Sequence, residues 1–144
     1  TTSLMEGKDI KIYGDGTQSR EFIYIDDLVS AYKIIIDKML SGKELAGEVI
    51  NIGTGVDVKV HHLAEVMVDK IEGPWIEPKN HDFSYPIETG EKKFEQGEII
   101  YGDSRPGEVK RFISNSDKMK SFGWKPKVDL EEGLKKYINW RKSL

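Results

Sequence analysis

The chain has 144 residues, of which 38% are hydrophobic and 33% are charged, and it contains no cysteine. This length and apolar content are enough for one packed domain and exclude a disordered tail; the lack of cysteine excludes a disulfide framework, a cysteine-ligated zinc site and a thiol nucleophile. The formal net charge of −3 argues against general affinity for nucleic acid, and no run of 18 apolar residues is present that would cross a membrane.

Two strands joined by a turn are expected near the start. Residues 9–13 alternate polar and apolar side chains, which is typical of a half-buried strand, and residues 21–25 form a second apolar run. Gly14 and Gly16 lie between them, and glycine takes positive φ at little cost. The sequence therefore predicts strand, turn and strand over residues 9–25.

A helix is expected from residue 27 to about residue 40. Asp26 and Asp27 stand where a helix N-cap belongs. The apolar positions of this helix form an unusually wide surface, which requires cover on more than one side. A partner domain, or self-association of the chain, would provide that cover.

The middle of the chain predicts a strand, a helix and a long loop. Residues 48–52 are expected to form a buried strand, and the apolar spacing of residues 59–71 predicts a helix. Residues 74–104 have no clear period, apart from a possible short strand at 98–101. A loop of this length within a domain tends to be functional.

The last third predicts two helices. Asp117 is a good N-cap for a short helix that ends at Gly123, and Trp124 opens a turn. Residues 129–132 form a capping box for the last helix, whose buried stripe is expected to comprise Leu130, Leu134, Tyr137 and Ile138. Residues 110–144 also hold 10 Lys and Arg against 4 Asp and Glu. Such lysines more often solvate helix faces than bind phosphate.

Self-contained catalytic motifs are missing from the sequence. Neither Gly14-x-Gly16 nor Gly53-x-Gly55 has the third glycine of a dinucleotide-binding loop. There is no P-loop, no Gly-x-Ser-x-Gly and no Tyr-x-x-x-Lys pair. The adjacent His61 and His62 cannot form an i, i+4 metal pair, so surface histidines are expected there and at His81. We therefore assign no catalytic, cofactor-binding or metal-binding residue.

Five blocks of the sequence occur in the order of a known family. Residues 13–28 (Tyr-Gly-Asp-Gly-Thr-Gln-Ser-Arg-Glu-Phe-Ile-Tyr-Ile-Asp-Asp-Leu) resemble the Y-G-D-G-x-Q-x-R-D-F-I-Y-V-D-D-L block of extended short-chain dehydrogenase/reductases, the NAD-dependent nucleotide-sugar epimerases and dehydratases. Residues 47–55, 105–108, 122–126 and 130–134 resemble the later G-E-x-x-N-I-G-T-G, R-P-G-[DE], L-G-W-x-P and L-E-E-G-L blocks. The resemblance covers nearly the whole chain except about 74–104.

The resemblance implies an α/β fold with short strands and about four helices, namely the C-terminal substrate-binding portion of such an enzyme over residues 1–144. It implies that the Rossmann domain, with its NAD loop and Tyr-x-x-x-Lys pair, is not in this chain. The wide helix surface agrees, because in the family this helix leans on that domain. Residues 74–104 are longer than the family's usual link, and Glu21 replaces the usual Asp.

The resemblance also implies a role for four residues. Arg20 would bind the diphosphate of the nucleotide sugar and Arg105 would clamp it from the other side, since a guanidinium meets two phosphate oxygens at once. The alternative for both is ion pairing with Glu21 or Glu108. Asn51 would lie near the phosphates, or else stabilise a turn. Glu108 would lie near the nucleotide ribose, or else be a solvated loop carboxylate.

The function expected from this resemblance is binding of a UDP- or dTDP-sugar for an NAD-dependent enzyme, most readily a UDP-sugar 4-epimerase. NAD would bind in the full-length enzyme and outside this chain, which would be inactive alone. A cytoplasmic location fits the lack of cysteine. Two other functions stay open: a free-standing nucleotide-sugar-binding module without catalysis, and an interaction protein derived from the family.

Overall fold

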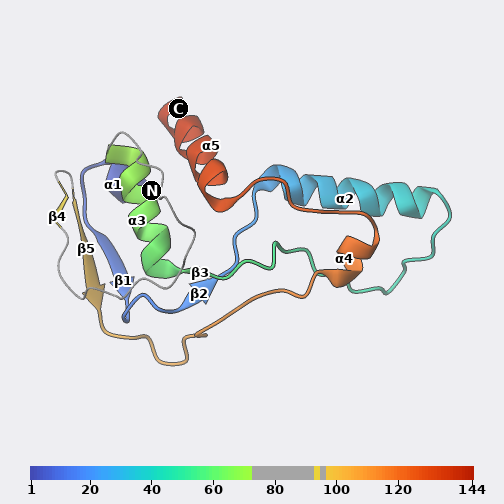
Figure 1. Cartoon of the computed structure of the whole chain (residues 1–144), viewed down its shortest axis with the longest axis horizontal. Coiled ribbons are helices and arrows are strands. Elements are labelled where there is room, and N and C mark those ends of the chain that lie inside the picture. The colour runs from blue at the N-terminus through green and yellow to red at the C-terminus, as the bar shows by residue number, and fades with distance from the viewer. Residues whose placement is uncertain (73–92, 95–96) are drawn as a thin grey trace.

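A computed structural model describes residues 1–72, 93–94 and 97–144 of the chain (Figure 1). The described elements are α1 (Thr2–Met5), β1 (Ile10–Tyr13), β2 (Ser19–Arg20), α2 (Ile25–Leu40), β3 (Val58–Lys59), α3 (Val60–Glu72), β4 (Lys93–Phe94), β5 (Gly97–Gly102), α4 (Asp117–Ser121) and α5 (Leu130–Lys142). The expected α/β class with short strands is confirmed. The described part has five helices rather than four, the additional one being the four-residue α1.

A small sheet and α3 form the first half of the molecule. Strand β1 pairs in parallel with β5, which pairs antiparallel with β4, and β2 pairs antiparallel with β3. Figure 1 shows α3 lying beside β1 and β5. Their shared core consists of buried apolar side chains from α1, β1, α3 and β5, namely Leu4, Ile12, Ala64, Val68 and Ile99.

A second core lies between α2 and α4, which Figure 1 shows extending away from the sheet. Its buried members are Ala31, Met119 and Trp124. The indole Nε1 of Trp124 donates to the backbone carbonyl of Asp27 at 3.0 Å and to the Ser30 hydroxyl at 3.0 Å. A fully buried indole N–H requires such a partner. This pair of hydrogen bonds fixes the segment after α4 against α2.

The start of α2 differs from the expectation. Strand β2 ends at Arg20, and α2 begins at Ile25 with Tyr24 as its N-cap, so the predicted strand over residues 21–25 is wrong. Asp27 is not a cap. The residue is 3% exposed, and its carboxylate accepts hydrogen bonds from the backbone N–H groups of Lys127 and Val128 at 2.9–3.0 Å. The Asp27 side chain, which the local sequence predicts as a helix cap, instead binds the backbone of a segment about 100 residues further along the chain.

The predicted buried strand at residues 48–52 is also wrong, since neither described sheet includes this segment. Ile50 and Ile52 are half-buried and pack against the core between α2 and α4, whereas Val49 and Asn51 are exposed. The alternation of the sequence is therefore real. A strand, however, also needs a hydrogen-bonded neighbour, and the described residues provide none here.

The remaining elements agree with the sequence more closely. Helix α3 matches the predicted 59–71, and β5 matches the predicted 98–101. Helix α4 begins at Asp117, but its N-cap is Ser116. The Asp129 carboxylate accepts from the backbone N–H of Glu132 at 2.8 Å, which confirms the cap of α5.

The buried stripe predicted for α5 is narrower than expected. Ile138 is buried, Leu130 and Leu134 are half-buried, and Tyr137 is exposed. Most of the predicted loop at 74–104 lies outside the described residues, so its conformation is not tested.

Candidate functional site

A cleft of about 290 Å³ lies between β1, α3 and the segment around residues 105–108. It is lined by Thr1, Ile10, Lys11, Ile12, Tyr13, Gln18, Arg20, Val60, Leu63, Ala64, Met67, Arg105 and Glu108. Three cationic side chains and one carboxylate are among them, although the whole chain has a net charge of −3. A locally positive, concave surface on an acidic protein favours an anionic ligand.

The turn from Tyr13 to Arg20 forms one edge of this cleft. Asp15 accepts hydrogen bonds from the backbone N–H (2.9 Å) and the hydroxyl (2.6 Å) of Thr17, and these bonds lower the pKa of Asp15. Gly16 has φ +74°, and a Cβ there would lie 2.8 Å from the Cβ of His61. Glycine is therefore required where the turn meets the first residues of α3.

Arg20 reaches the cleft from the end of β2. Its Nη1 donates to the backbone carbonyls of Ser19 and Val109, both at 2.7 Å. Its Nη2 lies 3.7 Å from Oε1 of Glu108, which is an ion-pair distance but longer than a charge-assisted hydrogen bond. One side of the guanidinium is thus used to hold the loop, while the other retains donors for a ligand.

Arg105 enters the cleft from the segment after β5. Its Cζ lies 3.8 Å from the centroid of the Tyr13 ring, a cation–π arrangement, and Lys11 Nζ lies 5.1 Å from the same ring. Both Tyr13 and Arg105 are exposed. The Tyr13 ring therefore holds two cations beside the cleft without neutralising either of them.

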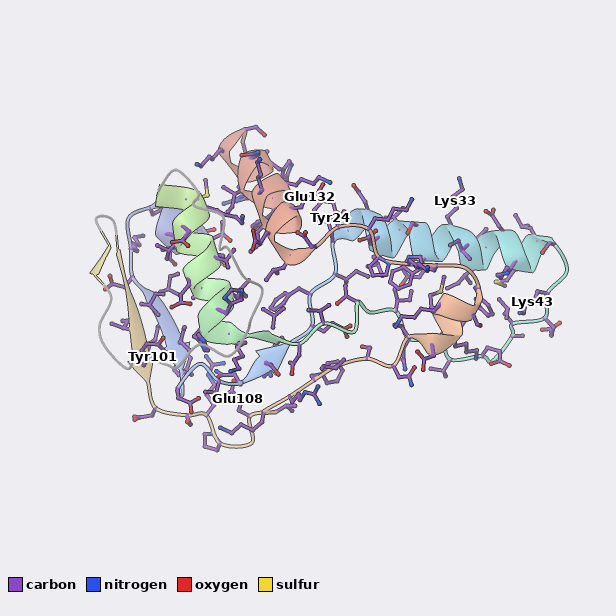
Figure 2. The ribbon with its side chains drawn as sticks, in the orientation of Figure 1. Tyr24, Lys33, Lys43, Tyr101, Glu108 and Glu132 are labelled. Carbon is purple, nitrogen blue, oxygen red and sulfur yellow. The ribbon has the colours of Figure 1, made fainter. Side chains whose placement is uncertain are left out.

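Glu108 is half-buried and has two polar neighbours; Figure 2 labels it on the loop that follows β5. Besides the 3.7 Å contact with Arg20, its Oε1 lies 3.5 Å from Nε2 of Gln18. Gln18 is 5% exposed, and the same Nε2 donates to the carbonyl of Tyr13 at 2.7 Å. Sequence reasoning missed Gln18 and Tyr13, although both stand in the block that contains Arg20.

The structure brings three of the four predicted residues together and leaves the fourth apart. Arg20, Arg105 and Glu108 line the cleft, whereas Asn51 does not. Asn51 is exposed in the segment where the expected strand does not form. The premise for its role, a polar side chain that ends a buried strand, is therefore wrong.

The Gly53-x-Gly55 turn is occupied by the protein's own carboxylate. Glu21 accepts hydrogen bonds from the backbone N–H of Gly55 and, at 2.8 Å, from that of Ser114. Burial acts to raise the pKa of Glu21, but these hydrogen bonds outweigh it, so the pKa lies below its ordinary value. A Cβ on Gly53 would come within 2.5 Å of the same carboxylate. The Glu21 carboxylate therefore takes the Gly55 N–H group, and the His61 side chain lies close to Gly16.

The two described histidines, His61 and His62, are both half-buried. His61 is half-buried with Nδ1 3.0 Å from the carbonyl of Gly16. His62 is half-buried, and burial lowers its pKa below the ordinary value. Both histidines therefore lie only partly at the surface that was predicted for them, and His81 lies outside the described residues.

Two other features are absent from the described part of the chain. No cluster of three or more His, Asp or Glu side chains in this part of the chain could hold a metal ion. None of the helices described is both long and apolar enough to span a bilayer.

A family model described as GDP-mannose 4,6 dehydratase matches residues 2–137. A dTDP-D-glucose 4,6-dehydratase of Bos taurus is 32% identical over 137 residues, which are 95% of this chain and 33% of the relative. The chain spans about a third of the length of the curated relatives it matches.

Solved structures show the same similarity. The UDP-glucose 4-epimerase of Thermotoga maritima, solved with UDP-glucose, is 28% identical at a TM-score of 0.70; the match covers 98% of this chain and 37% of that one. The UDP-glucuronic acid 4-epimerase of Bacillus cereus, solved with UDP-glucuronic acid and NAD, is 27% identical at a TM-score of 0.72, with the same two coverages. These relatives include both epimerases and a dehydratase.

Proposed function

The chain belongs to the GDP-mannose 4,6 dehydratase family, and on that premise we propose that it is the C-terminal, nucleotide-sugar-binding part of an NAD-dependent epimerase or dehydratase. One observation carries this proposal: Lys11, Arg20 and Arg105 meet in one cleft, where Glu108 is the one carboxylate among the described lining residues. The cleft also has apolar walls from β1 and α3. A nucleoside diphosphate is complementary to both features, because its flat base suits the apolar walls and its negative charge suits the cationic side chains.

The proposed work of the two arginines is to hold the diphosphate. Arg20 has free donors on the side away from the Ser19 and Val109 carbonyls, and Arg105 can leave the Tyr13 ring at a modest energetic cost. Binding energy from the diphosphate would then position the sugar, which is the part that reacts. A sugar anchored only through its diphosphate is free to turn over, as epimerisation at C4 requires.

The finer part of the proposal is that the ligand is a UDP-sugar and that the complete enzyme is a UDP-sugar 4-epimerase. Glu108 supports this choice, because a carboxylate beside the cleft can accept hydrogen bonds from the two hydroxyls of a ribose. A 2′-deoxyribose, as in dTDP, would offer only one. The relative solved with UDP-glucose agrees with this choice.

The chemistry itself is proposed to lie outside this chain. Both Gly-x-Gly turns are closed by the chain's own groups, Glu21 in one and His61 in the other, so neither fits NAD. NAD, which accepts the hydride in the family, would be held by the part of the enzyme that corresponds to the remaining length of the relatives. The exposed apolar side of α2 would pack on that part. The lack of cysteine favours a cytoplasmic location.

Titration of the purified chain with UDP, followed by calorimetry, tests this function. Arg105→Gln is expected to weaken UDP binding at least tenfold, because a charge-assisted hydrogen bond contributes roughly 1.5–3 kcal/mol. Arg20→Gln is expected to weaken it at least as much. Arg111→Gln is the matched control, since Arg111 pairs with Asp57 and does not line the cleft.

The outcome separates the functions that the sequence left open. Saturable UDP binding that depends on both arginines supports a substrate-binding part. No UDP binding by the unmodified chain would contradict the proposal and favour an interaction protein. Epimerase turnover by this chain alone would refute the assignment of catalysis to another part.

A further inference from the structure

We infer that Gln18 is a positioning residue of the cleft, which directs the Glu108 carboxylate toward the ligand and thereby sets the preference for ribonucleoside diphosphates. The inference rests on the proposed function, because it concerns the ligand of the same cleft. Gln18 lines this cleft from the turn between β1 and β2. It is 5% exposed, although glutamine is usually a surface residue.

The contacts of Gln18 join two walls of the cleft. Its Nε2 donates to the carbonyl of Tyr13, at the end of β1, at a short distance of 2.7 Å. The same nitrogen lies 3.5 Å from Oε1 of Glu108, ninety residues further along the chain. The strong bond to β1 fixes the amide, and the fixed amide presents its second hydrogen to Glu108.

The chemistry of the two partners calls for a group with two donor hydrogens at this point. A backbone carbonyl and a carboxylate only accept hydrogen bonds, and a side-chain NH₂ has two hydrogens to give. No hydroxyl could serve both partners, and a carboxyl group would repel one of them. The orientation of the Gln18 amide is therefore fixed by its neighbours.

This arrangement keeps Glu108 and Arg20 at ion-pair distance without a direct hydrogen bond. A carboxylate this close to a guanidinium would ordinarily form a hydrogen-bonded pair of 2.7–2.9 Å, but the Arg20–Glu108 separation is 3.7 Å. With both of its contacts long, at 3.5 and 3.7 Å, Oε1 keeps its capacity to accept from ligand hydroxyls. Arg20 Nη2 in turn keeps its N–H donors for phosphate.

Substitutions of Gln18 that preserve its size test the inference. The Gln18→Met change removes the donor, and we expect UDP to bind about tenfold more weakly. We also expect the preference for UDP over 2′-deoxy-UDP to fall to near equality, because Glu108 is no longer directed at the ribose. A purely structural role would lower both affinities by the same factor and leave their ratio unchanged.

Gln18→Glu adds a pH readout. The new carboxyl group faces two acceptors, which favours its protonated form, and that form can donate one hydrogen bond. The affinity of this variant for UDP, taken relative to the unmodified chain, is therefore expected to recover as the pH falls from 8 to 5.5. The ratio removes the titration of UDP itself.

Thr17→Val provides the control for damage to the turn. It removes the 2.6 Å bond to Asp15, but Thr17 does not line the cleft. Equal losses of UDP binding in the Thr17 and Gln18 variants, or an unchanged UDP to 2′-deoxy-UDP ratio in Gln18→Met, would overturn the inference. If the unmodified chain bound no UDP, the proposed function would fail first, and this inference with it.

Discussion

Glu21, which was predicted to lie in a strand, instead binds the backbone of two loops through its side chain. Its carboxylate collects the backbone N–H groups of Gly55 and Ser114, while the hydroxyl of Ser116 donates to the Gly53 carbonyl at 2.9 Å. Two loops that are distant in the sequence are thereby joined to the residue after β2. These contacts supply a structural reason for the Gly-Thr-Gly turn that does not depend on a ligand.

Replacing Glu21 tests this structural role. Glu21→Gln keeps the shape but loses the charge, and Glu21→Ala loses both; we expect the free energy of unfolding to fall by about 1–3 kcal/mol for the alanine variant and by less for glutamine. Chemical denaturation at pH 7 measures both values. Glu6→Gln is the control, because the exposed pair of Glu6 with Lys8 contributes little.

The pH dependence of stability gives a second measure of the same group. The pKa of Glu21 is lowered below its ordinary 4.5 in the folded chain, so its charged form stabilises the fold above that value. This contribution should be lost as the pH falls below 4.5 through the folded-state pKa. Glu21→Gln should lose less stability than the unmodified chain over that range; equal losses would contradict the account.

Of the charged residues that line the cleft, Arg20, Arg105 and Glu108 were predicted from the sequence, whereas Lys11 and the neutral residues were not. Arg20, Arg105 and Glu108 stand in short blocks whose residue types suit phosphate and hydroxyl binding. Gln18 stands two residues before Arg20, but its importance depends on burial and on a partner ninety residues away. The role predicted for Asn51 was wrong, because it depended on a strand that does not form.

Helix α2 is the element whose sequence and environment agree least. Ile25, Val29, Tyr32, Ile36 and Met39 repeat at spacings of four and three, the pattern of a helix seam that packs on a partner. Each of them is more than half exposed. The expectation of an uncovered apolar surface is therefore confirmed for this chain, and we propose that the rest of the enzyme covers it.

The exposed seam predicts a measurable property of the chain. We expect it to bind a hydrophobic dye, and the double variant Val29→Lys with Ile36→Lys should bind several-fold less dye with little change in the melting temperature, because both side chains are exposed. Leu144→Lys is the control, as Leu144 is exposed outside α2. Dye binding that is the same in all three chains would show that the seam is not an accessible patch.

Strands were predicted less well than helices, for a physical reason. The spacing of apolar residues in α3 and the cap of α5 are local signals, and both elements formed as expected. A strand depends on its neighbour, which can come from anywhere in the chain. Residues 10–13 pair with β5 and form β1, whereas residues 48–52 contact the second core through side chains and pair with no described strand.

The part of the molecule that the structure describes contains two cores, one under the sheet and one around Trp124. The α/β class followed from the sequence, but this division did not, because it depends on contacts such as that between Trp124 and Asp27, 97 residues apart. The cleft lies against the first core, and the exposed seam lies on the second. Ligand binding and docking to a further domain are thus proposed for different parts of the chain.

A titration of the ¹⁵N-labelled chain with UDP, followed by NMR, would locate the nucleotide site. We expect saturable shifts of the Gln18 side-chain amide and of the backbone signals of Arg20 and Glu108, with little change at Gly53 and Gly55. Shifts centred on Gly53 and Gly55, or no saturable shift at millimolar UDP, would contradict the assignment of this cleft as the nucleotide site.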